Sequence, residues 1–258
     1  IIRRTVAENR AFFTANAQED ERFNRKDSTI QKNVTSVVCV PLPMEGQIRG
    51  VVYLARSIAD SPFEKADMEL LSACALQLGL AFTGQNRLRQ NRRTLWNSLS
   101  AMVRAMETTR NRLGCGDRCA RASAAIGRAL NLSDDSVWQL QLAGLLYDLG
   151  RMDDLEGKHA IDVFNEVDNV TTVAELVRDG HERLNGKGPR HLEDQDLGTE
   201  ARVLAAAGAF SDAVLTDADS DAAKHIEALI GDTGFDQEVI KCLQACHLDG
   251  TLYQQIEG

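Results

Sequence analysis

The sequence predicts an α+β fold in its N-terminal third, a long connecting helix, and an all-α fold in the remainder. Residues 34–56, "VTSVVCVPLPMEGQIRGVVYLAR", contain two apolar, β-branched runs around a polar turn with Gly46, the pattern of two antiparallel strands. From Ser61 onward the apolar residues recur at helical spacing instead. Helical patterns then continue to the C-terminus, broken by a polar, Gly-rich stretch at residues 179–198.

Composition limits the class of protein. The 258 residues are 43% hydrophobic and 26% charged, enough to bury two ordinary domain cores. A net charge of −9 argues against nucleic-acid binding, and the basic stretch Arg87 to Arg93 is interpreted as a solvated helix face. The chain lacks an apolar run long enough to span a membrane, and we read its start as internal to a longer protein. The six cysteines are expected to be reduced, buried thiols in a cytoplasmic protein.

The helix after the strands has a recognisable start. Ser61 is a candidate N-cap, with Pro62 at the first helical position and Glu64 three residues after the cap. Apolar residues then follow at Met68, Leu71, Ala75, Leu78 and Phe82, and Gly84 is the one breaker before the next helical pattern.

That next pattern carries a hydrophobic seam. Its positions, at intervals of seven, four, three and four, are Leu88, Leu95, Leu99, Met102 and Met106. One interpretation is a parallel homodimer along the connecting helix. The other is packing of Leu99, Met102, Val103 and Met106 into their own domain, and both can hold in succession.

The helices that follow have clear termini. "GDRCARASAAIGRALNL" after Gly114 is helical, and Ser133 is expected to cap the next helix, with Asp134 and Asp135 at its positive end.

The first third resembles a GAF sensor domain. The resemblance rests on "VPL" and "GVVYL" in the strand pair and on the "PFEKADMELL" helix. It covers the later part of the family's fold, so residues 1–86 are expected to be a partial GAF-like domain, residues 87–112 the connecting helix, and residues 113–258 a second domain. We expect a structural role for Cys39 and assign this domain no ligand.

The second domain resembles the HD-GYP cyclic-dinucleotide phosphodiesterases. "LAGLLYDLGR" is similar to the helix that ends in the family's His-Asp pair, and "GHERLNGKGPR" to its His-His-Glu-Arg and GYP loop. "LGTEARVLAAAGAFSDAV" and "TGFDQEVIKCL" are similar to two later elements. The resemblance implies hydrolysis of a phosphodiester by clustered iron or manganese ions held by His and carboxylate ligands.

Several of the implied metal ligands are replaced in this sequence. Tyr147 stands in place of the histidine of the His-Asp pair, and Gly180 in place of the first histidine of the doublet. Gly208 falls on a metal-binding aspartate, Cys115 on a histidine, and Arg151 on a lysine. A phenol, a glycine and a thiol in these places weaken the cluster, so the resemblance predicts loss of catalysis and no required cofactor.

Four candidate ligands remain: Asp148, His181, Glu107 and His159. Three of them have a structural alternative: Asp148 could hold the turn beside Gly150, His181 with Glu182 could cap a helix end, and His159 could be a surface residue. In the decayed loop, where Asn185 replaces an aspartate, Arg183 and Lys187 could contact a phosphate or simply be solvated.

Cysteines offer one more arrangement. Cys115 and Cys119 could share a helix face, as could Cys242, Cys246 and His247, and the two helices together could bind zinc. Alanine-rich surroundings favour tight helix packing instead.

These observations lead to one functional hypothesis and two alternatives. The leading hypothesis is an intracellular signalling protein whose HD-GYP-like domain has lost phosphodiesterase activity and works through dimerisation or a protein partner. The first alternative is a metal-dependent cyclic di-GMP phosphodiesterase that uses Asp148 and His181 with Fe or Mn. The second is a cyclic-nucleotide receptor that binds through Arg183 and Lys187 without hydrolysis.

Overall fold

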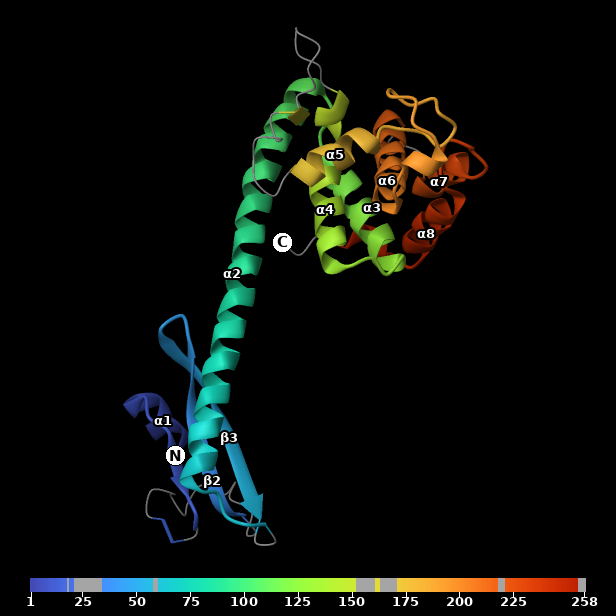
Figure 1. Cartoon of the computed structure of the whole chain (residues 1–258). Coiled ribbons are helices and arrows are strands. Elements are labelled where there is room, and N and C mark those ends of the chain that lie inside the picture. The colour runs from blue at the N-terminus through green and yellow to red at the C-terminus, as the bar shows by residue number, and fades with distance from the viewer. Residues whose placement is uncertain are drawn as a thin grey trace. The chain divides into compact units, whose positions relative to one another are not determined.

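The chain divides into two compact units. In the computed structural model, the described residues are 1–17, 19–20, 34–57, 60–151, 161–162, 171–217 and 221–254. Residues 1–92 form one unit, here called the sheet unit, and residues 93–258 the other, called the helical unit. Figure 1 shows the three-stranded sheet of the first and the packed helices of the second.

The sheet unit contains the predicted strand pair. β2 (Val34–Met44) and β3 (Gln47–Ser57) are antiparallel, and the short β1 (Phe12–Thr14) pairs with the other edge of β2. Glu45 and Gly46 connect β2 to β3 with φ angles of 53° and 75°, the left-handed conformation that a two-residue hairpin turn requires. The β-branched runs therefore form the expected hairpin.

Helices cover the two faces of this sheet. Val38 and Val40 of β2 form a buried cluster with Phe63 and with Ala75 of α2 (Lys65–Arg110). The alternate residue Val37 packs near Ile1, beside α1 (Ile2–Glu8). This alternation is the period-two pattern of a strand with both faces covered.

The predicted start of the long helix is wrong by several residues. α2 begins at Lys65, and the side chain of Asp67 accepts a hydrogen bond from the backbone N–H of Glu64 at 2.8 Å. The backbone N–H of Phe63 donates to the Ser36 hydroxyl instead, which anchors the segment to the sheet at 2.7 Å. This contact with the sheet explains why the helix does not start at Ser61, where the local sequence predicts its cap.

One glycine fixes how closely α2 approaches the sheet. A Cβ at Gly79 would lie 1.9 Å from the carbonyl oxygen of Pro43, so only glycine allows this backbone contact. Gly84, by contrast, has open space around it, and α2 continues through it without a break.

The predicted seam divides into two parts. Leu88 and Leu95 are exposed, whereas Leu99 is buried in the core of the helical unit with Val103. Met102 is 61% exposed, so the interpretation that it faces its own core is wrong. Cys74 on the same helix is also exposed, unlike the buried thiol that we expected there.

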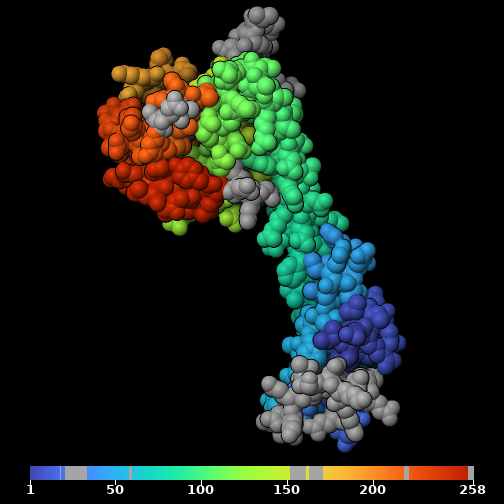
Figure 2. Space-filling model, turned by 180° about the vertical axis from the view of Figure 1, so that it is seen from behind, coloured from blue at the N-terminus to red at the C-terminus, as the bar shows by residue number. Residues whose placement is uncertain are grey.

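The helical unit confirms the all-α prediction for the remainder of the chain. Its elements, after the last turns of α2, are α3 (Cys115–Ala129), α4 (Asp134–Leu145), η1 (Tyr147–Arg151), α5 (Thr171–Asp179), η3 (Asp194–Asp196), α6 (Thr199–Thr216), α7 (Ala222–Leu229), α8 (Gln237–Leu248) and η4 (Thr251–Tyr253). Figure 2 shows this unit from behind, with α7 and α8 in orange and red on the side away from the last turns of α2.

Small residues and side-chain caps explain the close helix packing. A Cβ at Gly144 in α4 would lie 2.6 Å from the backbone of Ala120 in α3, so these two helices touch along their backbones. Ser133 caps α4 as predicted, because its hydroxyl accepts from the Ser136 N–H. The two tryptophans, Trp96 of α2 and Trp138 of α4, lie with ring centroids 6.3 Å apart.

None of the helices in the described part of the chain is both long and apolar enough to cross a membrane.

Candidate functional site

Asp148 is held by an arginine that follows α2. Nε of Arg112 donates to Oδ2 of Asp148 at 2.6 Å, and Nη2 donates to Oδ1 at 2.8 Å. Both carboxylate oxygens therefore accept from one guanidinium in a bidentate pair, the geometry for which arginine is suited. The carboxylate of Asp148 raises the pKa of Arg112, which stays charged at all relevant pH values.

Asp212 of α6 extends the pair into a network. Nη2 of Arg112 also donates to Oδ1 of Asp212 at 2.6 Å, and Nη2 of Arg151 donates to Oδ2 of Asp212 at 2.5 Å. Two carboxylates thus alternate with two guanidinium groups, and their formal charges cancel. We call Arg112, Asp148, Asp212 and Arg151 the charge network.

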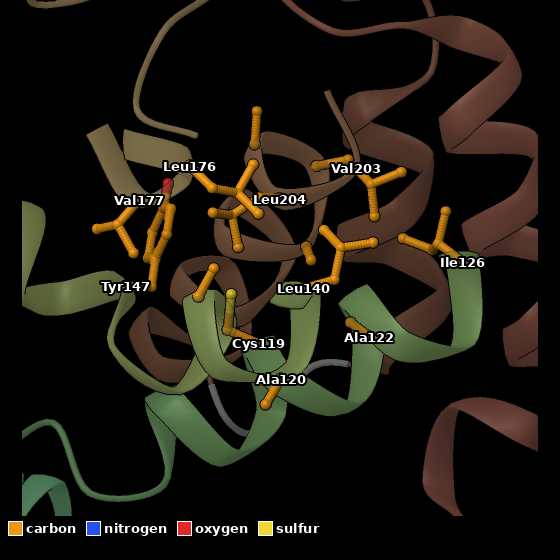
Figure 3. Packing of buried hydrophobic residues seen from close by; sticks show 14 of the residues in the cluster. Cys119, Ala120, Ala122, Ile126, Leu140, Tyr147, Leu176, Val177, Val203 and Leu204 are labelled. Carbon is orange, nitrogen blue, oxygen red and sulfur yellow. The ribbon is translucent and has the colours of Figure 1, made fainter. Parts of the chain in front are cut away.

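Tyr147 occupies the space next to this network. Its side chain is buried between α5 and α6, near Val177 and Leu204 (Figure 3). A Cβ at Gly208 would lie 2.1 Å from Cζ of Tyr147 and 2.5 Å from its hydroxyl. The two substitutions are therefore complementary, because the absent side chain at residue 208 leaves the volume that the phenol fills. Burial raises the pKa of Tyr147 to about 12, so the phenol remains protonated.

His181 packs against Tyr147 and is neutral. The two ring centroids lie 4.1 Å apart, and Nε2 of His181 is 2.9 Å from the carbonyl oxygen of Tyr147. Since Nε of Arg151 donates to Nδ1 at 3.4 Å, the hydrogen-bond pattern assigns the proton to Nε2. Burial lowers the pKa of His181 to about 4. We call Tyr147, His181 and Gly208 the aromatic corner.

The side chain of Glu107 binds backbone N–H groups. Glu107 is 4% exposed, and its carboxylate accepts hydrogen bonds from the N–H groups of Gly114 at 2.8 Å and Gly116 at 2.6 Å. These are orphan donors at the start of α3, so Glu107 acts as an N-terminal cap supplied by α2.

Glu182 organises the glycine-rich loop in a similar way. Its buried carboxylate accepts from the N–H groups of Arg190 at 2.8 Å and Leu192 at 3.2 Å. A Cβ at Gly188 would lie 2.3 Å from one of the Glu182 oxygens, which explains why the loop keeps this glycine. The loop is built around an internal carboxylate.

The two candidate phosphate contacts differ in their surroundings. Arg183 donates to the carbonyl oxygens of His181 and Glu182 and lies over the ring of Phe235, 4.7 Å from its centroid. Lys187 has an exposed side chain at the tip of the loop. Arg183 is therefore engaged in holding the loop, and Lys187 faces solvent.

The remaining candidates do not gather at one point. His159 lies outside the described residues. Cys115, Cys119 and Cys246 are buried and Cys242 is partly buried, and burial raises the pKa values of the Cys115 and Cys119 thiols. Within the described ranges, no group of three or more His, Cys, Asp and Glu side chains is arranged to hold a metal ion.

The described residues do not fit the metal cluster that the HD-GYP resemblance implies. Both oxygens of Asp148 and both oxygens of Glu107 accept hydrogen bonds, and each ring nitrogen of His181 has a partner. The positive charge beside Asp148 comes from Arg112 instead. A metal ion would have to displace guanidinium and backbone donors that are already in place.

Sequence reasoning missed Arg112 and Asp212. Asp212 follows Gly208 by four residues and lies one turn later on the same face of α6, a spacing that could have pointed to it. No local signal marks Arg112, since its partners are 36 and 100 residues away in the chain.

Comparison with known proteins identifies the first third of the chain. Residues 2–82 match the GAF domain family, which confirms the resemblance found in the sequence. Among solved structures, the chain is similar to an HDG"Y"P protein from Bdellovibrio bacteriovorus, with 16% identity and a TM-score of 0.44 over 93% of this chain and 100% of that one. No curated protein matches the chain.

Proposed function

We propose that the chain is a signalling protein in which a GAF sensor unit precedes an HD-GYP-like module that no longer hydrolyses phosphodiesters. The observation that carries this proposal is the bidentate pair between Arg112 and Asp148. It places a guanidinium on the carboxylate that the resemblance implies as a metal ligand.

The chemistry of hydrolysis explains why this matters. A metal-assisted reaction needs carboxylate and imidazole lone pairs free to fix the ion, and an activated water as nucleophile. Here the lone pairs of Asp148 are shared with Arg112, and Tyr147 remains a neutral phenol. The Nε2–H group of His181 donates a hydrogen bond to the backbone carbonyl of Tyr147. In the arrangement seen, these three groups hold one another and the backbone, which supports the proposal that they no longer act on a metal-bound water.

In this proposal the output is an interaction between proteins, with a second copy of the chain as the first partner. The exposed side chains of Leu88 and Leu95 are seven residues apart on α2, as in a coiled-coil seam. The same spacing extends back through Ala81 to Cys74, both of which are exposed. A parallel pair of α2 helices would bury this stripe.

Metal analysis combined with an activity assay tests the loss of hydrolysis. Protein purified without chelator is expected to contain less than stoichiometric iron and manganese and to leave cyclic di-GMP intact with either metal added. His181→Ala tests whether any turnover belongs to this site, and His191→Ala, at an exposed histidine, is the matched control. Turnover that disappears in His181→Ala alone would establish the phosphodiesterase alternative.

The same preparation separates the receptor alternative. Calorimetric titration with cyclic di-GMP is expected to give no saturable binding, since Arg183 is already engaged with carbonyl groups and Phe235. Saturable binding that weakens at least tenfold in Lys187→Ala, without turnover, would favour a receptor.

Light scattering tests the dimer. The full chain is expected to be a dimer, and Leu88→Glu with Leu95→Glu is expected to give a monomer, because buried carboxylates would face each other along the seam. Leu76→Glu is the matched control, since Leu76 is 49% exposed on another face of α2. A monomeric wild-type chain at all concentrations would contradict this part of the proposal.

A further inference from the structure

The turn after α2 joins the helix to three other elements. Asn111 has a φ of 56° and ends the helix, and α3 begins at Cys115. Within this short turn, Arg112 contacts Asp148 of η1 and Asp212 of α6. One turn earlier, Glu107 caps α3. The last turns of α2 therefore fix the start of α3, η1 and the second half of α6 through polar contacts.

A cavity of about 20 Å³ lies beside this turn, between the last turns of α2 and the end of α4 with η1. Its lining residues are Val103, Met106, Glu107, Arg110, Leu145, Asp148 and Leu149. That volume accommodates about one water molecule. The polar contacts of Arg112 thus connect α2 to η1 beside this cavity.

The two carboxylates of the network depend on Arg112 to different degrees. Asp212 has a second cation, Arg151, at 2.5 Å. Among the described residues, Asp148 has a single ion-pair partner, Arg112. Withdrawal of Arg112 would thus leave Asp212 paired and Asp148 with an uncompensated, partly exposed charge.

We propose that Arg112 is a latch that transmits the state of the last turns of α2 to η1. When these turns are helical, the guanidinium lies between Asp148 and Asp212 and η1 is held against α6. When they loosen, Asp148 loses its counter-charge and η1 becomes mobile. The inference rests on the proposed function, because it treats the helical unit as an output that α2 regulates.

Hydrogen–deuterium exchange on the full chain tests the latch. Ala101→Gly with Ala105→Gly loosens α2 at two exposed positions without removing a core contact. With Arg112 present, this pair is expected to raise exchange about tenfold at residues 147–151, with a smaller rise at residues 209–216. Arg112→Gln alone is expected to raise exchange at residues 147–151 to a similar level.

The combination of variants is decisive. In the Arg112→Gln background, the two glycine substitutions are expected to add nothing at residues 147–151, because the connection is already broken. Equal increments in both backgrounds, or no rise from the glycine pair when Arg112 is present, would overturn the latch. Arg104→Gln is the matched control, since Arg104 is an exposed arginine of the same helix that does not line the cavity, and it is expected to leave exchange unchanged.

A conservative variant of Arg112 provides a further test. Arg112→Lys retains a positive charge but loses the bidentate geometry, so it should show an intermediate rise at residues 147–151 if Arg112→Gln does not fold. A rise no larger than that of Arg104→Gln would count against the latch. Because exchange is measured without substrate or metal, failure of the latch and failure of the proposed loss of hydrolysis are separate results.

Discussion

The aromatic corner and the charge network lie side by side and are stabilised by different forces. Tyr147 is 2% exposed and packs against Gly208 and His181, whereas the side chains of Asp148 and Arg112 are 20% and 28% exposed. Close packing tolerates little change in volume, while partly solvated ion pairs contribute modestly to stability. Two consecutive residues, 147 and 148, therefore belong to one region that is sensitive to shape and one that is sensitive to charge.

Gly208→Ala is expected to have the largest effect, because it inserts a methyl group into the aromatic corner. The Cβ would lie 2.1 Å from the Tyr147 ring, and both the ring and the helix around residue 208 are buried. We expect a loss of about 3 kcal/mol in the free energy of unfolding, measured by urea denaturation.

Gly84→Ala is the matched control, since it lies in an exposed stretch of α2 with open space around it. It should be neutral or stabilising by up to about 1 kcal/mol. Adding Tyr147→Ala to Gly208→Ala should recover part of the loss, and strict additivity of the two changes would contradict the steric pairing.

Acid should weaken the aromatic corner through His181. Its folded-state pKa of about 4 lies below the ordinary value of 6.5, so the unfolded chain binds the proton more readily. This contribution to stability is complete above pH 6.5 and is lost as the pH falls from 6.5 toward 4, by about 3 kcal/mol. The difference in unfolding free energy between wild type and His181→Gln should change over this window. A constant difference would show that His181 does not titrate in this way.

Glu107→Ala is expected to have an intermediate effect. The change leaves the Gly114 and Gly116 N–H groups without their carboxylate, and the Glu107 side chain is buried. A loss of about 2 kcal/mol follows from leaving such donors unsatisfied. Thermal unfolding of Glu227→Ala, at an exposed glutamate, provides the comparison and should match wild type.

Asp148→Asn should have the smallest effect of the four. It removes the charge from a partly exposed pair, and we expect a loss of about 1 kcal/mol in the free energy of unfolding. Asp117→Asn, which disturbs the more exposed pair with Arg121, should cost less than about 0.5 kcal/mol. A larger loss for Asp148→Asn than for Gly208→Ala would reverse the contrast between the two regions.

The elements that depend on neighbouring residues could be predicted from the sequence. The hairpin at Gly46 and the cap at Ser133 follow from short-range rules and occur where expected. The start of α2 was misplaced because the backbone N–H of Phe63 donates to Ser36, 27 residues earlier in the chain. A capping prediction from local sequence fails where a residue distant in the chain binds the same backbone group.

The sequence predicted some residues of the site but not their contacts, for a related reason. Tyr147 and Gly208 were recognised as substitutions, but their complementarity in volume appears only when α6 lies against η1. Asp148 was identified as a candidate, whereas its partner Arg112 is 36 residues away with no motif to mark it. Two replacements that compensate one another in space lie far apart in the sequence, so the sequence alone does not show that they are related.

The pair of tryptophans gives the helical unit an optical signal of its own. Trp96 and Trp138 are the two tryptophans of the chain, and their rings are tilted by 52° at a centroid distance of 6.3 Å. Indole transitions this close couple to each other, so near-ultraviolet circular dichroism should carry a band from the α2–α4 contact. Separation of α2 from α4 can therefore be followed in the unlabelled protein as the disappearance of that band.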